Sequence, residues 1–97
     1  MKRIETNEKR LDNLNKVVLD LDIALSKFEE SIPDLSKLNK YYESKEWLKD
    51  KDDYENGKYQ SIKAGVLSED AIWNLDEDIG DILDRMNNIL NSIKKQD

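Results

Sequence analysis

The sequence predicts an all-α protein in which two long antiparallel helices carry a short helical, aromatic-rich middle segment as a third layer. In two long stretches, apolar residues recur at alternating steps of three and four, as they do on one face of a helix. The stretch between them holds five of the seven aromatic residues. At 97 residues with a formal net charge of −6, the chain suits one domain, 1–97, with a modest core.

The first predicted helix covers residues 4–32, without Gly or Pro. Pro33 is expected to end it, because proline disfavours the α conformation of the residue before it. Leu19 and Ile23 lie outside the two heptad rows, so an antiparallel pair of helices cannot cover both the rows and them. The rows are Ile4, Leu11, Val18, Leu25 and Ile32, and Asn7, Leu14, Leu21 and Phe28.

Residues 34–67 are expected to form a short helix, to about Tyr42, and an acidic loop. Ser44 is expected to cap a turn that contains Trp47, and the segment 50–64 to be irregular with a turn at Asn56-Gly57. The aromatic residues have two interpretations: a lid that completes the core over the long helices, or a binding surface for another protein. The candidate partner-binding residues are Leu19, Ile23, Tyr41, Tyr42, Trp47 and Tyr54.

A sharp corner is predicted to begin the second long helix, which covers residues 68–95. Ser68 is a preferred N-cap residue, and the carboxylates after it favour the positive end of the helix dipole. Leu67 and Ile72 have the spacing of a hydrophobic staple, and Gly65 is expected to allow a positive φ. The structural motif therefore consists of Gly65, Leu67, Ser68, Glu69, Asp70 and Ile72.

The composition excludes several kinds of function. Cysteine and histidine are both absent, which removes disulfides, Cys/His zinc sites and the commonest general base. The negative net charge argues against direct binding to nucleic acid or to anionic membranes. The N-terminus does not resemble a signal peptide, and no run is long enough to span a membrane, so a cytoplasmic protein is expected.

No metal, cofactor or catalytic site is predicted. The acidic run at 50–55 does not match the EF-hand pattern. A calcium loop starting at Asp50 would have Glu55 at the glycine position and Ser61 at the position of the bidentate glutamate. Glu69 and Asp70 already have a structural explanation in the first turn of a helix. A metal-dependent hydrolase that uses this pair is therefore the least favoured hypothesis.

The tyrosine pair at 41–42, Ser44, Trp47 and Asp50, followed by GVLSED at 65–70 and Trp73, resemble a known pattern. It belongs to the family called domain of unknown function 4298, small proteins of Gram-positive bacteria. The resemblance extends from about residue 38 to the end. Members commonly carry a Leu-Pro pair before GVLSED, where this chain has Tyr59-Gln60. The resemblance implies a small bacterial helical protein and carries no activity with it.

Two functions remain open. The first is a small acidic interaction or regulatory protein, without catalytic activity, that presents a helical surface to a protein partner or to a second copy of itself. The alternative is an acidic inhibitor or nucleic-acid mimic from a mobile element, which would occupy the basic groove of a nucleic-acid-binding enzyme. Salt would distinguish them, because mimicry should weaken steeply with ionic strength and an apolar contact should not.

Overall fold

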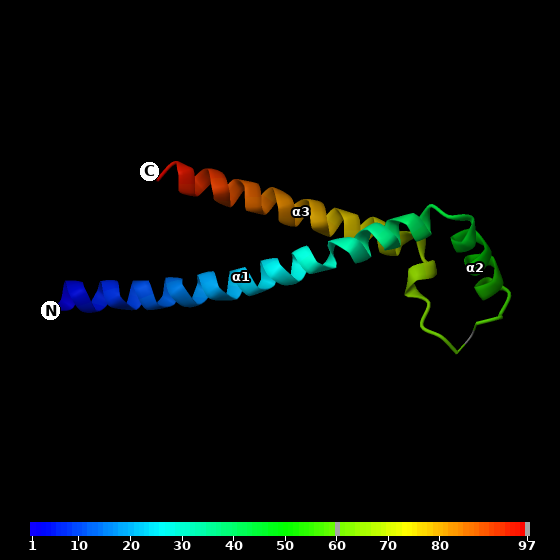
Figure 1. Cartoon of the computed structure of the whole chain (residues 1–97), viewed down its shortest axis with the longest axis horizontal. Coiled ribbons are helices and arrows are strands. Elements are labelled where there is room, and N and C mark those ends of the chain that lie inside the picture. The colour runs from blue at the N-terminus through cyan, green and yellow to red at the C-terminus, as the bar shows by residue number, and fades with distance from the viewer. Residues whose placement is uncertain (60, 97) are drawn as a thin grey trace. The chain divides into compact units, whose positions relative to one another are not determined.

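The computed structural model describes residues 1–59 and 61–96, and every regular element in these ranges is helical (Figure 1). In chain order the elements are α1 (Lys2–Tyr42), α2 (Lys45–Glu55), the single 3-10 turn η1 (Gly65–Leu67) and α3 (Glu69–Lys94). The prediction of an all-α chain with two long helices and a short helical middle segment is confirmed. The chain divides into two compact units, Met1–Leu38 and Asn39–Asp97, so α1 contributes to both.

Helix α1 continues through Pro33, and the predicted end of the helix at residue 32 is wrong. The helix expected to start at residue 34 is the last part of α1. A proline inside a helix removes one backbone hydrogen bond and costs about 3 kcal/mol. The apolar spacing stays in phase across it, because Leu35 follows Phe28 by seven residues. The hydroxyl of Ser31, two residues before Pro33, also donates to the carbonyl of Phe28 at 2.7 Å.

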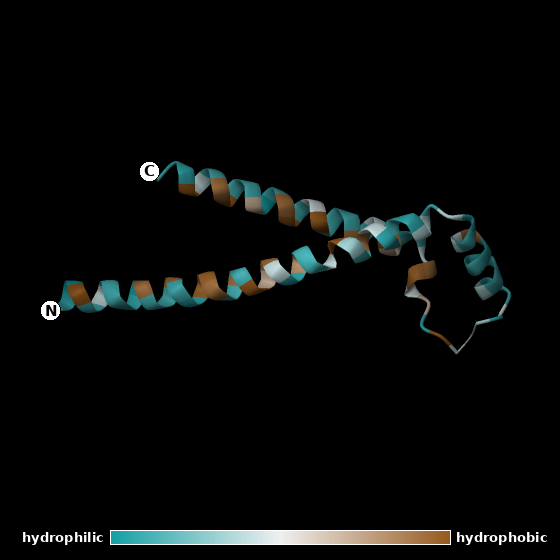
Figure 2. Ribbon diagram, viewed as in Figure 1, coloured by the Kyte–Doolittle hydropathy of each residue, from teal (hydrophilic) through white to brown (hydrophobic). Residues whose placement is uncertain are grey.

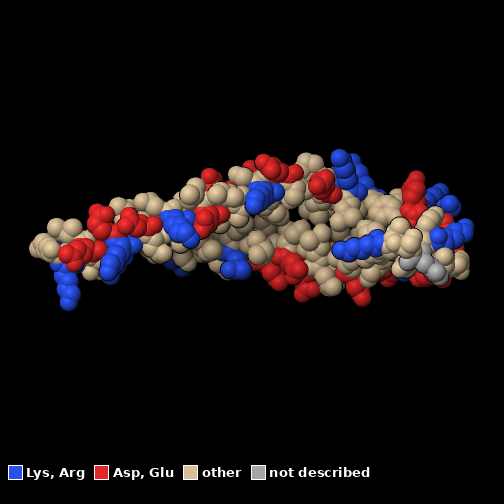
Figure 3. Space-filling view, turned by 90° about the horizontal axis from the view of Figure 1, so that it is seen from below, with Lys and Arg blue, Asp and Glu red and all other residues tan. Residues whose placement is uncertain are grey.

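In the first unit the apolar residues recur along the whole of α1 (Figure 2). Leu25 and Phe28 are half-buried, but most of the two heptad rows are exposed. Charged residues of both signs alternate with them, and Figure 3 shows Lys and Arg beside Asp and Glu along the N-terminal part of α1, at its left end. This unit is therefore a single helix with apolar and mixed-charge surface and no buried residue of its own.

Helix α2 begins as predicted and ends later than predicted. Ser44 has an extended backbone and accepts a hydrogen bond from the Trp47 amide at 3.2 Å, which makes it the N-cap. The segment expected to be irregular from residue 50 is helical as far as Glu55. The chain then turns at Asn56-Gly57, where Gly57 has a φ of 86°, the left-handed conformation that glycine adopts most easily.

The corner before α3 differs in two details from its prediction. Ser68 is the N-cap by position and backbone conformation, but its side chain makes no capping hydrogen bond. Its carbonyl accepts from the Ala71 amide at 3.3 Å, and its amide donates to the Gly65 carbonyl at 3.1 Å. Gly65 does not have a positive φ, because the corner is made by a 3-10 turn that suits ordinary backbone angles.

The remaining residues of the corner lie as expected. Leu67 is buried, and Glu69 and Asp70 occupy the first turn of α3. Ile72 is half-buried, and its stapling contact with Leu67 stays a prediction. In Figure 2, α3 shows a hydrophobic side and an opposite hydrophilic side. None of the described helices has a stretch both long and apolar enough to cross a bilayer.

Candidate interaction surfaces

The buried centre of the second unit is the indole of Trp47, which is 5% exposed. Its Nε1–H donates to the Val66 carbonyl at 3.0 Å, and the Tyr42 ring lies 5.3 Å from its ring centroid at 36°. The phenol of Tyr42 in turn donates to the Ser68 carbonyl at 3.1 Å. The end of α1, the start of α2 and the turn before α3 therefore meet on one aromatic cluster. We call these residues, Tyr42, Trp47, Val66 and Ser68, the aromatic corner.

Tyr41 is held in place by a hydrogen bond to α2. Its hydroxyl donates to Asp50 Oδ2 at 2.7 Å. This hydrogen bond, partial burial and the nearby negative charge raise the pKa of Tyr41 to about 12. Burial also raises the pKa of Tyr42. Both phenols thus stay protonated in neutral solution, where Tyr41 donates to Asp50 on α2 and Tyr42 donates to Ser68 in the aromatic corner.

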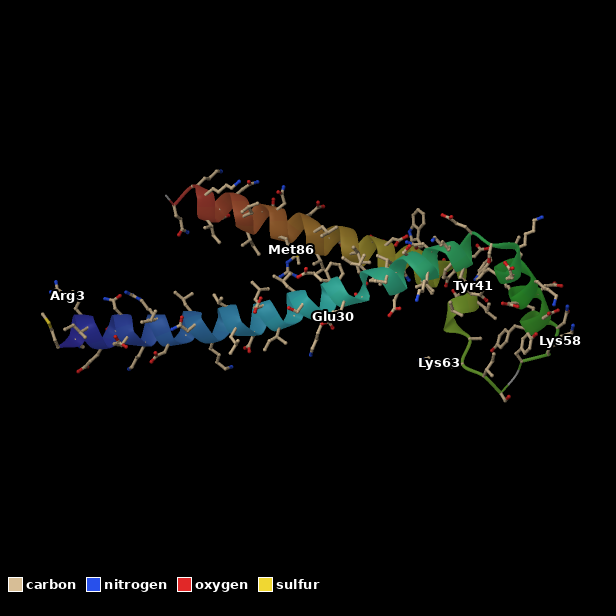
Figure 4. The ribbon with its side chains drawn as sticks, viewed as in Figure 1. Arg3, Glu30, Tyr41, Lys58, Lys63 and Met86 are labelled. Atoms are coloured by element: carbon tan, nitrogen blue, oxygen red, sulfur yellow. The ribbon has the colours of Figure 1, made fainter. Side chains whose placement is uncertain are left out.

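A small open pocket of about 210 Å³ lies beside the Tyr41–Asp50 pair. Ile62 and Leu67 supply apolar walls, and Lys63 stands on the segment before η1 (Figure 4). Two of its polar side chains are already paired, because the Asp50 carboxylate accepts a hydrogen bond from the Tyr41 hydroxyl. The pocket has no histidine or cysteine in its lining, so it lacks the usual general bases and nucleophiles.

Asp53 is a buried charge that was not predicted from the sequence. It is 8% exposed and accepts from Lys58 Nζ at 3.2 Å, with Lys49 Nζ at 3.7 Å from its other oxygen. The Lys58 amide also donates to the Asp53 carbonyl at 3.0 Å. These bonds close the turn after α2 and satisfy the carboxylate, so Asp53 is a structural residue. In the sequence, the i,i+4 spacing of Lys49 and Asp53 was the pattern that could have indicated an ion pair here.

The candidate partner-binding residues separate into two groups. Tyr41, Tyr42 and Trp47 come together in the second unit and serve the packing of α2, while Tyr54 on α2 is 36% exposed. Leu19 and Ile23 lie on α1 in the first unit, 59% and 48% exposed. The aromatic residues and this pair therefore belong to different units of the chain.

Trp73 is a surface residue that was not among the predicted partner-binding residues. It is 73% exposed on α3 and, with Asp76 and Glu77, lines an open hollow of about 510 Å³. Further carboxylates lie one turn before it, at Glu69 and Asp70. Within the described residues no three carboxylates gather closely enough to hold a metal ion. The signal in the sequence was the placing of acidic residues three and four positions to either side of a tryptophan.

Comparison with known protein families gives a match over most of the chain. The model of the family described as domain of unknown function (DUF4298) matches residues 4–89, nearly the whole chain. The match includes the tyrosine pair, Trp47, the GVLSED corner and Trp73. Searches of curated proteins and of solved structures returned no match.

Proposed function

We propose that this chain, which belongs to the DUF4298 family, is a non-catalytic interaction protein that offers the apolar surface of α1 to another protein chain. The observation that carries the proposal is the exposure of Leu19 and Ile23, on a side of α1 away from its heptad rows. Burying a leucine or isoleucine side chain stabilises a complex by about 1.5–3 kcal/mol. A helix that leaves such residues in water gains free energy when a partner covers them.

The composition of α1 supports a protein partner. Most of its heptad residues are exposed together with Val17, Leu19 and Ile23, so apolar side chains point to more than one side of the helix. The helix-in-groove and coiled-coil modes of binding use this kind of surface. The occupant is either a second copy of the chain or a different protein. The proposal places the protein in the cytoplasm, following the sequence expectation.

The central experiment replaces Leu19 and Ile23 with lysine in one variant. The matched control is Thr6→Lys with Asn13→Lys, which adds the same two charges to exposed polar positions of α1. Light scattering gives the mass of each variant, and circular dichroism gives its helix content. We expect the Leu19/Ile23 variant to lose association, with helix content unchanged, and the control to behave as the wild type.

The outcomes separate the partners. A smaller mass for the Leu19/Ile23 variant alone identifies self-association. An unchanged mass directs the test to pull-downs from the source cell, where the variant should lose a protein that the control retains. Binding through apolar contact should also persist at high ionic strength, whereas the alternative of an acidic nucleic-acid mimic requires a steep loss. If mass and pull-down are both unchanged, the proposal is wrong.

A further inference from the structure

The polar face of α3 carries an exposed tryptophan surrounded by carboxylates. Because side chains three and four positions apart are neighbours on a helix, the ring of Trp73 is bordered on both sides. Asp76 and Glu77 line the hollow beside it. Between Glu69 and Asp84 this face of α3 carries no Lys or Arg, because Arg85 and Lys94, the basic residues of α3, lie nearer its C-terminal end. The bordering residues are Glu69, Asp70, Asp76 and Glu77.

Elsewhere in the chain, an indole and a carboxylate already bind a cationic side chain together. Lys51 Nζ lies 5.3 Å from the ring centroid of Trp47 and 3.2 Å from Glu69 Oε1. The ammonium group thus interacts with the face of an indole and with a carboxylate at the same time. Around Trp73 the indole and the carboxylates are present. Among the described residues, no lysine or arginine is within 4.0 Å of the carboxylates of Asp70, Asp76 and Glu77.

We propose that this face of α3 is a docking site for an arginine-bearing basic segment of a partner protein, with the guanidinium seated over Trp73 and paired with Asp76 and Glu77. Arginine fits better than lysine, because its planar group stacks on an aromatic face and its N–H groups donate to carboxylates at the same time. The mutual repulsion of the carboxylates is relieved when the cation arrives. The site lies on α3 and does not depend on the proposed role of α1.

Gly80, which has no side chain, lies on the same face of α3 as Trp73. It lies seven residues after Trp73, two turns along the same side of the helix, and a Cβ there would meet nothing within 4 Å. An incoming segment therefore finds no side chain at this position. Asp84 lies one further turn along and continues the acidic face, so a partner with a second basic residue gains a second ion pair.

The test titrates the full-length protein with a synthetic peptide of alternating arginine and glycine, followed by nuclear magnetic resonance of the two indole N–H groups. Trp73→Phe assigns the signals. We expect the Trp73 signal to shift and saturate, while that of Trp47, which is hydrogen-bonded to Val66, stays in place. A peptide with citrulline for arginine has the same shape without the charge and should not bind. Binding of the citrulline peptide with equal affinity would overturn the proposal, as would a Trp73 signal that does not move.

Two matched variants test the carboxylates. Asp76→Asn with Glu77→Gln removes two charges beside Trp73, and Asp12→Asn with Glu8→Gln removes two from α1. We expect the first to weaken peptide binding about fivefold or more, and the second by less than about twofold. Equal weakening would mean that the peptide responds only to net charge, and the site would be rejected. The Leu19/Ile23 variant should bind the peptide as the wild type does, which keeps this result separate from the role of α1.

Discussion

The phenol of Tyr42 donates a 3.1 Å hydrogen bond to the carbonyl of Ser68, 26 positions along the chain. Ser68 is the residue from which α3 starts, and Tyr42 is the last residue of α1. The same tyrosine ring packs against Trp47. Within the aromatic corner, one side chain therefore joins the end of α1 to the beginning of α3.

Tyr42→Phe should destabilise the second unit modestly. The ring and its packing on Trp47 remain, and only the hydrogen bond to the Ser68 carbonyl is lost, which costs about 0.5–1.5 kcal/mol. Urea unfolding followed by circular dichroism measures the change. Tyr54→Phe is the matched control, since that ring is more exposed, and it should be neutral. A neutral Tyr42→Phe would mean that the Ser68 carbonyl is equally well satisfied by water.

The two N-cap serines should respond differently to alanine. Ser44 accepts from the Trp47 amide and donates to the Tyr41 carbonyl, so Ser44→Ala should cost about 1 kcal/mol. Ser68 makes no side-chain capping bond, and Ser68→Ala should change the free energy of unfolding by less than about 0.5 kcal/mol. Denaturant melts of both variants provide the comparison. An equal cost at the two positions would show that the Ser68 hydroxyl caps α3 in solution.

The Tyr41–Asp50 pair predicts a loss of stability in alkali. The unfolded chain releases the Tyr41 proton near the ordinary pKa of 10, whereas the folded chain holds it to about 12. Between these values the unfolded state binds fewer protons, so the free energy of unfolding falls as the pH rises. Below pH 10 the contribution is complete.

Tyr41→Phe is the variant that tests this window. It should be less stable than the wild type at neutral pH and should show a shallower decline between about pH 10 and 12. The decline will not vanish, because Tyr42, whose pKa is also raised, remains. Urea midpoints across the pH range measure the slopes. Parallel slopes for the variant and the wild type would remove Tyr41 as their cause.

Local signals in the sequence predicted most of the helices. Ser44 and Ser68 each mark a helix start, and Asn56-Gly57 marks the turn after α2. The predicted helix end at Pro33 was wrong, because the rule that proline ends a helix was given more weight than the apolar spacing that continues beyond it. The free energy lost with one hydrogen bond is small compared with that of the many hydrogen bonds that remain in a helix of 41 residues.

The surfaces were less predictable than the helices. Periodicity places Leu19 and Ile23 away from the heptad rows, but whether a neighbour covers them depends on packing that no local pattern encodes. Trp47 and Trp73 are chemically identical, and only the position of each on its helix makes one buried and the other exposed. The acidic neighbours of Trp73 were readable from the sequence once the helix was known.

The last prediction separates the two tryptophans by fluorescence. Trp47 is buried and Trp73 is exposed, so a Trp73→Phe variant should emit at short wavelength and shift to the red on unfolding. A Trp47→Leu variant, which leaves only Trp73, should already emit near the water-exposed maximum and change little in urea. Circular dichroism of both variants checks that the helices persist. Emission from Trp47 at the exposed maximum in the native protein would contradict its place in the core and favour the earlier alternative, a surface for a partner. Because each variant retains a single indole, each reports on one tryptophan alone and the pair can be compared directly.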